Sequence, residues 1–178
     1  MANENNRIFC EEQRFSPMLR LAVTFTMTVT VILESFVLGK ILTSDVVEVL
    51  AVVLLLIFGI LLPTGMAVLF MMLRLETEVR PDGLYVRFFP IHLNFRKFAV
   101  EDLKEYYART YKPISEFGGW GIRCGWRGSK AYNVSGNKGV QLVLKNDKQL
   151  LIGSQKPDKL VNAIGSVAQK FGLPSQSS

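Results

Sequence analysis

The chain has 178 residues, of which 49% are hydrophobic and 20% are charged, and its formal net charge is +6. Two cysteines and one histidine exclude a disulfide-rich scaffold and any site that needs two imidazoles, and the length allows one ordinary domain plus a membrane anchor. Residues 1–73 carry four basic and six acidic side chains, whereas residues 74–178 carry seventeen basic and nine acidic ones. The basic surplus of residues 74–178 indicates either attraction to an anionic membrane surface or a solvated face.

The first 17 residues are polar and too acidic for a transit peptide. They are expected to form an N-terminal segment that is cytoplasmic by the positive-inside rule. A first membrane helix is predicted over residues 18–38, because this stretch is apolar apart from Arg20 and Glu34. It lacks the cleavage site of a secretory signal, which indicates an uncleaved anchor. Glu34 lies near the end of the helix, and we expect it to be hydrated at the interface or paired with Lys40 rather than functional.

A second membrane helix is predicted over residues 47–73. No charged side chain occurs between Val49 and Leu73, and about twenty apolar helical residues cross a hydrocarbon layer about 30 Å thick. Pro63 and Gly65 predict a kink in this helix, of the kind found where helices pack. Residues 18–73 are therefore interpreted as a helical hairpin in the membrane.

The distribution of basic residues predicts the orientation of this hairpin. Lys40 is the only basic residue in the connection between the helices, whereas several flank the hairpin on its other side. By the positive-inside rule both termini are cytoplasmic, and the protein is expected to be a multi-pass plasma-membrane protein. The flanking residues that carry this argument are Arg7, Arg14, Arg20, Arg74, Arg80 and Arg87.

From residue 75 the apolar residues alternate with a period of two, which is typical of strands. The turn sequence from Arg80 to Gly83 predicts a hairpin between strands 75–80 and 84–89. Residues 90–98 are expected to be irregular, and residues 100–103 to form a helical turn. Further strands are predicted over residues 106–112, 120–127, 130–134, 140–145 and 149–153.

One amphipathic helix is predicted to close the domain. Pro157 suits its first turn and Asp158 favours the positive end of the helix dipole. The fold class is α+β: a transmembrane helical hairpin, then a domain over residues 74–172 with about seven strands in a bent sheet or partly open barrel, capped by this helix. Residues 173–178 are expected to form a flexible tail. The apolar stripe of the helix consists of Leu160, Ile164, Val167, Ala168 and Phe171.

The run GGWGIRCGWRGSKAYNVSGNKGVQLVL, followed by LLIGSQKPDKLVNAI, resembles a family of small prokaryotic membrane proteins of unknown function. These proteins carry a pleckstrin-homology-like domain after two membrane helices. The resemblance implies this fold at the membrane. Related bacterial domains tend to assemble into homo-oligomers and to act as adaptors or as parts of membrane-stress responses. Lipid-binding eukaryotic relatives place several basic residues around the first hairpin, whereas here Arg80 and Arg87 flank Asp82, which argues against phosphoinositide recognition there.

No catalytic set can be assembled from this sequence, so an enzyme is not expected, and neither is a cofactor or a metal. Two groups remain as candidate binding residues. Arg123, Arg127 and Lys130 surround one hairpin turn and suit a phosphate or carboxylate, or they form a solvated face. A polar stretch suits a peptide backbone or small ligand, or supplies turn residues; it consists of Tyr132, Asn133, Ser135, Asn137 and Gln141.

The favoured hypothesis is a membrane-anchored, non-enzymatic interaction module that binds itself or another membrane protein through exposed strand edges. The alternative is recognition of an anionic lipid or a phosphorylated small ligand by the basic hairpin. No nucleic-acid motif accompanies the basic surplus, and nucleic acid is not an expected partner. Trp120 and Trp126 are expected in the core, because both lie on the apolar side of an alternating run.

Overall fold

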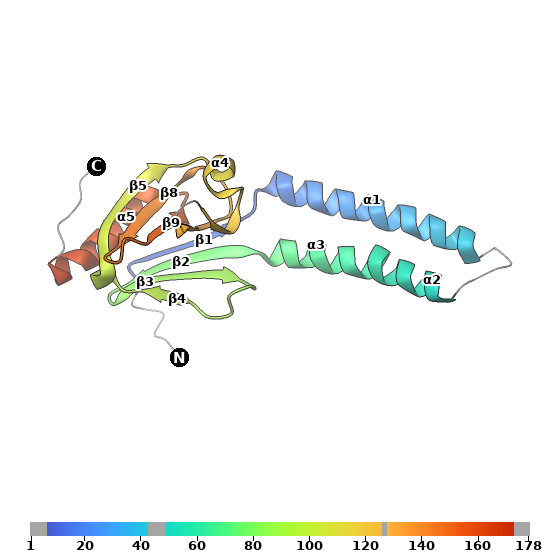
Figure 1. Ribbon diagram of the computed structural model, residues 1–178, viewed down its shortest axis with the longest axis horizontal. Coiled ribbons are helices and arrows are strands. Elements are labelled where there is room, and N and C mark those ends of the chain that lie inside the picture. Colours follow the sequence, from blue (N-terminus) through green and yellow to red (C-terminus); the bar gives the residue numbers. More distant parts are fainter. Residues whose placement is uncertain (1–6, 43–48, 126–127, 173–178) are drawn as a thin grey trace. The chain divides into compact units, whose positions relative to one another are not determined.

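The computed structural model describes residues 7–42, 49–125 and 128–172 (Figure 1). The chain forms two compact units, and each is described by itself. One unit combines Met1–Arg14 with Arg74–Ser178, and the other consists of Phe15–Leu73. The predicted tail over residues 173–178 lies outside the described residues, as do Trp126 and Arg127.

The helical unit contains two apolar helical segments. Helix α1 covers Pro17–Leu42, and the second segment runs without a break through α2 (Val49–Leu54), the π-helix η2 (Leu55–Leu61) and α3 (Leu62–Met72). By length and composition, Pro17–Lys40 and Val52–Met72 are each suited to cross a membrane. The hydroxyls of the α1 threonines donate to carbonyls one turn back, as from Thr28 to Thr24, which reduces the cost of burying them in lipid.

The π-helix lies just before Pro63, which has no N–H to donate to the carbonyl of Gly59 in an α-helical pattern. A longer hydrogen-bond spacing is observed here, with the Leu62 N–H donating to the Ile57 carbonyl. On the facing helix, the Glu34 carboxyl group occupies the space that a Cβ at Gly59 would fill. Glu34 therefore lies at the contact between the two helices.

Sheet A contains the predicted hairpin and adds a strand on either side. Its order is β1-β2-β3-β4, and all neighbours are antiparallel. Arg80 and Gly83 close the β2–β3 hairpin, where Gly83 has a φ of 155°. The strands are β1 (Phe9–Arg14), β2 (Arg74–Arg80), β3 (Gly83–Phe89) and β4 (Arg96–Phe98).

Sheet B has the order β5-β8-β9-β7-β6, in which β7 and β9 are parallel and the other neighbours antiparallel. The predicted helical turn before it is a 3₁₀ turn, η3, at Val100–Asp102, and a short helix, α4 (Pro113–Phe117), follows β5. The strands are β5 (Leu103–Thr110), β6 (Gly121–Cys124), β7 (Lys130–Asn133), β8 (Lys138–Leu144) and β9 (Gln149–Gly153).

The closing helix α5 (Pro157–Ala168) contacts strands of both sheets, including β2 and β5, and the 3₁₀ turn η5 (Gln169–Phe171) extends it. Leu160, Ile164, Val167 and Ala168 of the predicted stripe are buried. The prediction was wrong for Phe171, whose side chain is 43% exposed. The helix tightens to the 3₁₀ form at Gln169, which changes the spacing that would have kept Phe171 on the stripe.

The described residues form nine strands in two open sheets, which corrects the predicted single bent sheet or partly open barrel of about seven strands. One additional strand, β1, pairs with β2 in an unbroken register from Phe9↔Val79 to Arg14↔Arg74. Its inward side chains are polar and reach the end of β9. The Glu11 carboxylate accepts from the Ser154 hydroxyl at 2.6 Å and from the Gln155 N–H at 2.8 Å.

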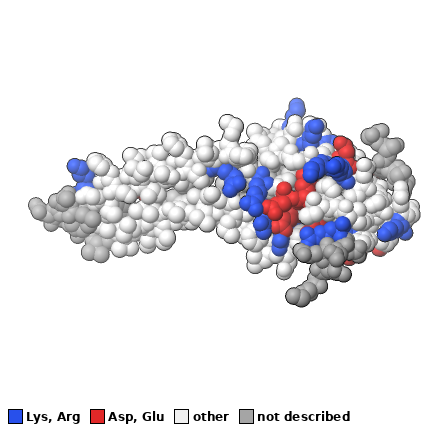
Figure 2. Space-filling model, turned by 180° about the vertical axis from the view of Figure 1, so that it is seen from behind, with Lys and Arg blue, Asp and Glu red and all other residues white. Residues whose placement is uncertain are grey.

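The outer face of sheet A carries charges of both signs in pairs. Glu76 pairs with Arg74 and Arg87, and Glu78 pairs with Arg7 and Arg80. On the side of the molecule drawn in Figure 2, acidic and basic side chains likewise gather next to one another. The basic surplus of residues 74–178 is thus partly neutralised and does not form one positive surface on this face of the sheet.

Candidate functional site

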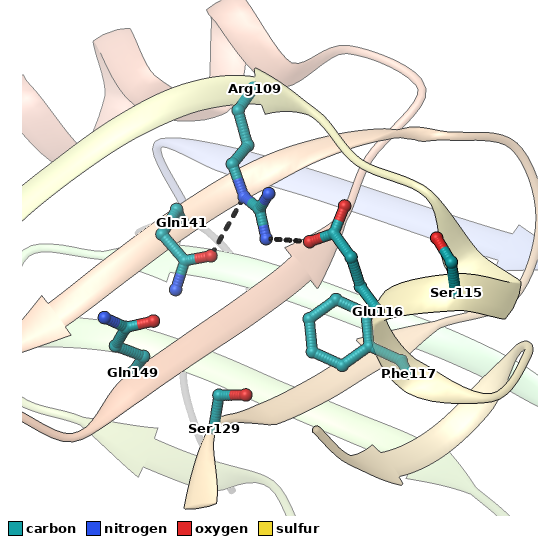
Figure 3. A pocket seen from close by; sticks show the side chains of 7 residues that line it. All are labelled: Arg109, Ser115, Glu116, Phe117, Ser129, Gln141 and Gln149. Atoms are coloured by element: carbon teal, nitrogen blue, oxygen red, sulfur yellow. Dashed lines mark hydrogen bonds and ion pairs between the residues drawn. The ribbon is translucent and has the colours of Figure 1, made fainter. Parts of the chain in front are cut away.

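A cavity of about 360 Å³ lies where α4 covers one face of sheet B. Strand side chains form its floor, and α4 forms one wall (Figure 3). The residues that line it are mostly polar, which distinguishes it from a gap in the core. They are Arg109, Ser115, Glu116, Phe117, Ser129, Gln141 and Gln149.

Local sequence explains why a short helix forms here. Pro113 occupies the first turn, and Gly118 adopts the left-handed conformation, with a φ of 70°, that ends the helix. The N–H of Gly118 donates to the Ile114 carbonyl, which closes this end. Phe117 is buried beside Tyr111, with 6.1 Å between the ring centroids, and it fixes α4 on the sheet.

Arg109 on β5 joins the floor of the cavity to the α4 wall. Its Nε–H donates to Gln141 Oε1 at 3.0 Å, and its Nη2 donates to Glu116 Oε2 at 2.8 Å (Figure 3). The other Glu116 oxygen accepts from the Lys112 N–H at 2.7 Å. Burial alone would raise the pKa of Glu116, but hydrogen bonds from Lys112 and Arg109 hold this pKa below its ordinary value of 4.5.

These groups suit binding better than catalysis. The cavity presents donors and acceptors from the amide of Gln149 and the hydroxyl of Ser115, which match a peptide or carboxamide group. Its carboxylate, Glu116, is already paired with Arg109, and no histidine or cysteine is among the described lining residues. Among the residues that the structure describes, no group of three or more His, Cys, Asp or Glu side chains could hold a metal.

Strand β5 lies beside this cavity at the edge of sheet B, where β8 is its only neighbouring strand among those described. The Tyr111 N–H donates to the Asn137 carbonyl on the β8 side, so by strand alternation the N–H groups of Thr110 and Ala108 point away from β8. Tyr107 is 40% exposed, and Ala108 and Thr110 are exposed. This edge is therefore able to accept a further strand.

The predicted basic cluster is only partly within the described residues, because Arg127 lies outside them. Arg123 is directly opposite Ala131, and Lys130 is directly opposite Cys124. Because successive residues of a strand face opposite sides, Arg123 and Lys130 lie on opposite faces of the β6–β7 hairpin. The two described members do not converge, and anion binding by this hairpin stays a prediction.

The predicted polar stretch is distributed between the interior and the surface. Tyr132 and Asn133 are buried: the Tyr132 hydroxyl accepts from Arg96 at 3.1 Å, and Asn133 Oδ1 accepts from the Gly121 N–H at 2.9 Å. Ser135 is half-buried, and Asn137 is exposed. Gln141, although only 3% exposed, is the member that lines the cavity.

Sequence reasoning missed Arg109 and Glu116. Pro113 and Gly118, which bracket α4, could have indicated a short helix that carries Glu116. Nothing local could have indicated the partner of Arg109, because Gln141 on β8 is 32 residues away in sequence. Trp120, expected in the core, is half-buried, and its Nε1–H donates to the Gly136 carbonyl at 3.1 Å. Trp120 directly precedes β6, which is an edge strand of sheet B among the described residues, and this position explains its partial exposure.

No curated protein matches the chain, and no solved structure matches it. A family model matches residues 3–171, which include both apolar helices and both sheets. The chain therefore belongs to DUF6141, a family of unknown function.

Proposed function

We propose that this protein is a membrane-anchored, non-enzymatic interaction module of a prokaryotic plasma membrane, with both termini in the cytoplasm. Two helices apolar enough to span a bilayer support the anchoring, and the basic residues that flank them support the orientation. The order of strands followed by a closing helix supports kinship with pleckstrin-homology-like domains, which act as adaptors.

The observation that carries the proposal is the open edge of β5. A strand of eight residues with a neighbour on one side can pair with an extended segment of a partner, whose backbone then continues sheet B. Tyr107 offers a partly exposed ring on this strand, and Arg109 reaches into the adjacent cavity. The partner is an extended segment of a second copy or of another membrane protein.

The cavity supplies selectivity for that segment. A polar side chain of the added strand would meet the cavity on its β5 side and exchange hydrogen bonds with Arg109 and Glu116. The ion pair between Arg109 and Glu116 holds the wall in place before the partner arrives, so little ordering is needed on binding. Backbone pairing then gives affinity, and the cavity gives preference for a polar residue.

The test is the native mass of full-length protein in lipid nanodiscs, measured for the wild type and for Ala108→Pro. Proline removes an N–H that points away from β8, so it blocks strand addition while the pairing of β5 with β8 is kept. Ala108→Val is the matched control, because it keeps this N–H. Each backbone hydrogen bond contributes about 1 kcal/mol net, so we expect association to weaken about fivefold or more in the proline variant.

Thermal unfolding of the same samples shows whether Ala108→Pro is still folded. A homo-oligomer or a stable second chain that is retained in Ala108→Val and lost in folded Ala108→Pro supports the proposal. A wild-type protein that is monomeric with nothing bound contradicts it. A complex that survives the proline substitution also contradicts it, because contact must then occur elsewhere.

A further inference from the structure

The loop between β3 and β4, residues 90–95, presents two large apolar side chains outward. Ile91 is 58% exposed and Leu93 is 72% exposed. The loop backbone is held from within: the His92 N–H donates to the Phe88 carbonyl at 2.8 Å, and Arg87 Nη1 donates to the Leu93 carbonyl at 3.3 Å. The two apolar side chains are thus displayed by a fixed turn, and exposing them to water is unfavourable.

This loop starts at the end of sheet A to which both apolar helices attach. Phe89, the last residue of β3, is directly opposite Arg74, the first residue of β2. Only Leu73 separates Arg74 from the end of α3 at Met72. On the other side, Arg74 is opposite Arg14, and two residues connect Arg14 to the start of α1.

Charged and aromatic groups surround the base of the loop. The guanidinium of Arg74 lies 4.9 Å from the Phe89 ring centroid, and that of Arg87 lies 5.7 Å from it. Arg96, at the far end of the loop, is exposed. Arginine and aromatic rings at the level of the headgroups, with aliphatic side chains beyond them, are characteristic of segments that enter the membrane interface.

We propose that residues 90–95 form a second membrane contact, in which Ile91 and Leu93 enter the headgroup region of the bilayer that the two apolar helices cross. The proposal rests on the membrane anchoring proposed above. The occupant is lipid, because the covalent connections at Arg14 and Arg74 keep this end of the sheet within a few residues of the bilayer. A loop seated in this way would restrict how the domain turns on its anchor.

The test places a fluorescent label on the loop without removing either apolar side chain. Asn94 is exposed and lies between Leu93 and Phe95, so Asn94→Cys is labelled in a chain with Cys10→Ser and Cys124→Ser. Full-length protein is placed in liposomes that contain lipids with a nitroxide near the headgroup. We expect strong quenching of the label by these lipids and weak quenching by iodide in water.

The matched control is a label at Asn146→Cys. Asn146 lies with Phe98 beside a second cavity, and Phe98 is opposite Leu84, at the end of sheet A away from Arg74. This label should be quenched by iodide and not by the lipids. Adding Ile91→Asp and Leu93→Asp to the Asn94 sample should reverse its pattern to that of Asn146, with lipid quenching reduced severalfold.

A third label separates this proposal from the anchoring itself. Met66→Cys lies within the second apolar segment and should be quenched by lipids with a nitroxide deep in the acyl chain. If Met66 is quenched and Asn94 behaves like Asn146, the loop proposal is wrong and the anchoring stands. If Met66 is not quenched by lipid, both proposals fail. Persistent lipid quenching at Asn94 after the two aspartate substitutions would also overturn the role of Ile91 and Leu93.

Discussion

His92, the only histidine of the chain, is held against the domain by its ring and its backbone. Its ring meets the Tyr132 ring edge-on, with 5.9 Å between centroids. Burial, together with the positive charge of Arg96, lowers the pKa of His92 from its ordinary value of 6.5. The folded state therefore prefers the neutral imidazole, and protonation at this position opposes folding.

This shift predicts a pH dependence of stability with a defined sign. The folded state binds the His92 proton less readily than the unfolded state, so the contribution is complete above about pH 6.5 and is lost as the pH falls through the lowered pKa. We expect the melting temperature to be lower at pH 5.5 than at pH 7.5, measured on full-length protein in nanodiscs.

His92→Phe provides the control, because it keeps an aromatic ring beside Tyr132 and removes the titrating group. Its melting temperature should change little between pH 7.5 and 5.5. Asp82 and Glu116 do not contribute to the difference between pH 7.5 and 5.5. Their pKa values are lowered from ordinary values of 3.8 and 4.5, so both groups titrate at more acidic pH. An equal drop in His92→Phe would show that another group is responsible.

The two apolar helices make a close contact that can be tested by glycine substitution. A Cβ at Gly59 would collide with the Glu34 carboxyl group, whereas a Cβ at Gly65 would meet nothing within 4 Å. Alanine favours a helix over glycine by about 1 kcal/mol, so Gly65→Ala should be neutral or stabilising. In Gly59→Ala the Glu34 side chain must turn away from the new methyl group, so this variant should melt at a lower temperature than Gly65→Ala.

A double substitution shows whether Glu34 is the cause. Glu34→Ala removes the group that the new methyl would strike, so Gly59→Ala should cost much less in that background. The interaction is measured as a double-mutant cycle from four melting curves in nanodiscs. If the two changes in melting temperature are additive, Glu34 and Gly59 are not in contact. The close contact between the helices described at the π-helix would then be contradicted.

How far the elements could be predicted depended on whether their partners are local. The β2–β3 hairpin was predicted because its turn and its alternation lie within sixteen residues, and the structure confirms it. Strand β1 was missed because its inward residues, Glu11 and Gln13, are polar and break the expected pattern. The groups that satisfy them, from Gly153 to Gln155, are about 140 residues away in sequence.

The same reasoning applies to the candidate site. Gln141 was singled out within a polar stretch, but nothing in its surroundings indicated that Arg109 would bond to it from the neighbouring strand. Arg123 and Lys130 were grouped by closeness in sequence, and the register then placed them on opposite faces. Strand pairing over long separations decides which side chains meet, and a local pattern does not contain that information.

At the scale of the whole molecule, the helical unit is an insertion between two adjacent strands. Arg14 ends β1 and Arg74 begins β2, and the two residues are directly opposite each other in the sheet. The chain thus leaves the sheet at the end of β1 and returns to it at the start of β2, at the same end of this antiparallel pair. A force on the helix pair would act on β1 and β2 together, since each is attached by only a few residues.

This arrangement predicts that residues 74–178 alone are an incomplete domain. Without β1, the Ser154 hydroxyl, the Gln155 N–H and the Gly153 carbonyl lose their partners on Glu11 and Gln13. Each buried polar group left unpaired costs about 1–3 kcal/mol, and about 1 kcal/mol shifts the melting temperature of such a domain by about 4–8 °C. Residues 74–178 should therefore melt well below a chain in which β1 is retained.

The chain for comparison joins residues 7–14 to residues 74–172 through a two-residue Asn-Gly turn. This turn suits two strands whose ends are directly opposite, as Arg14 and Arg74 are. A second version with Glu11→Ala and Gln13→Ala keeps the strand but removes its polar contacts, and its melting temperature should lie between the other two. Equal melting temperatures for the joined chain and for residues 74–178 would mean that β1 adds nothing to the domain. The intermediate variant then divides the contribution of β1 between backbone pairing with β2 and the contacts that Glu11 and Gln13 make with the end of β9.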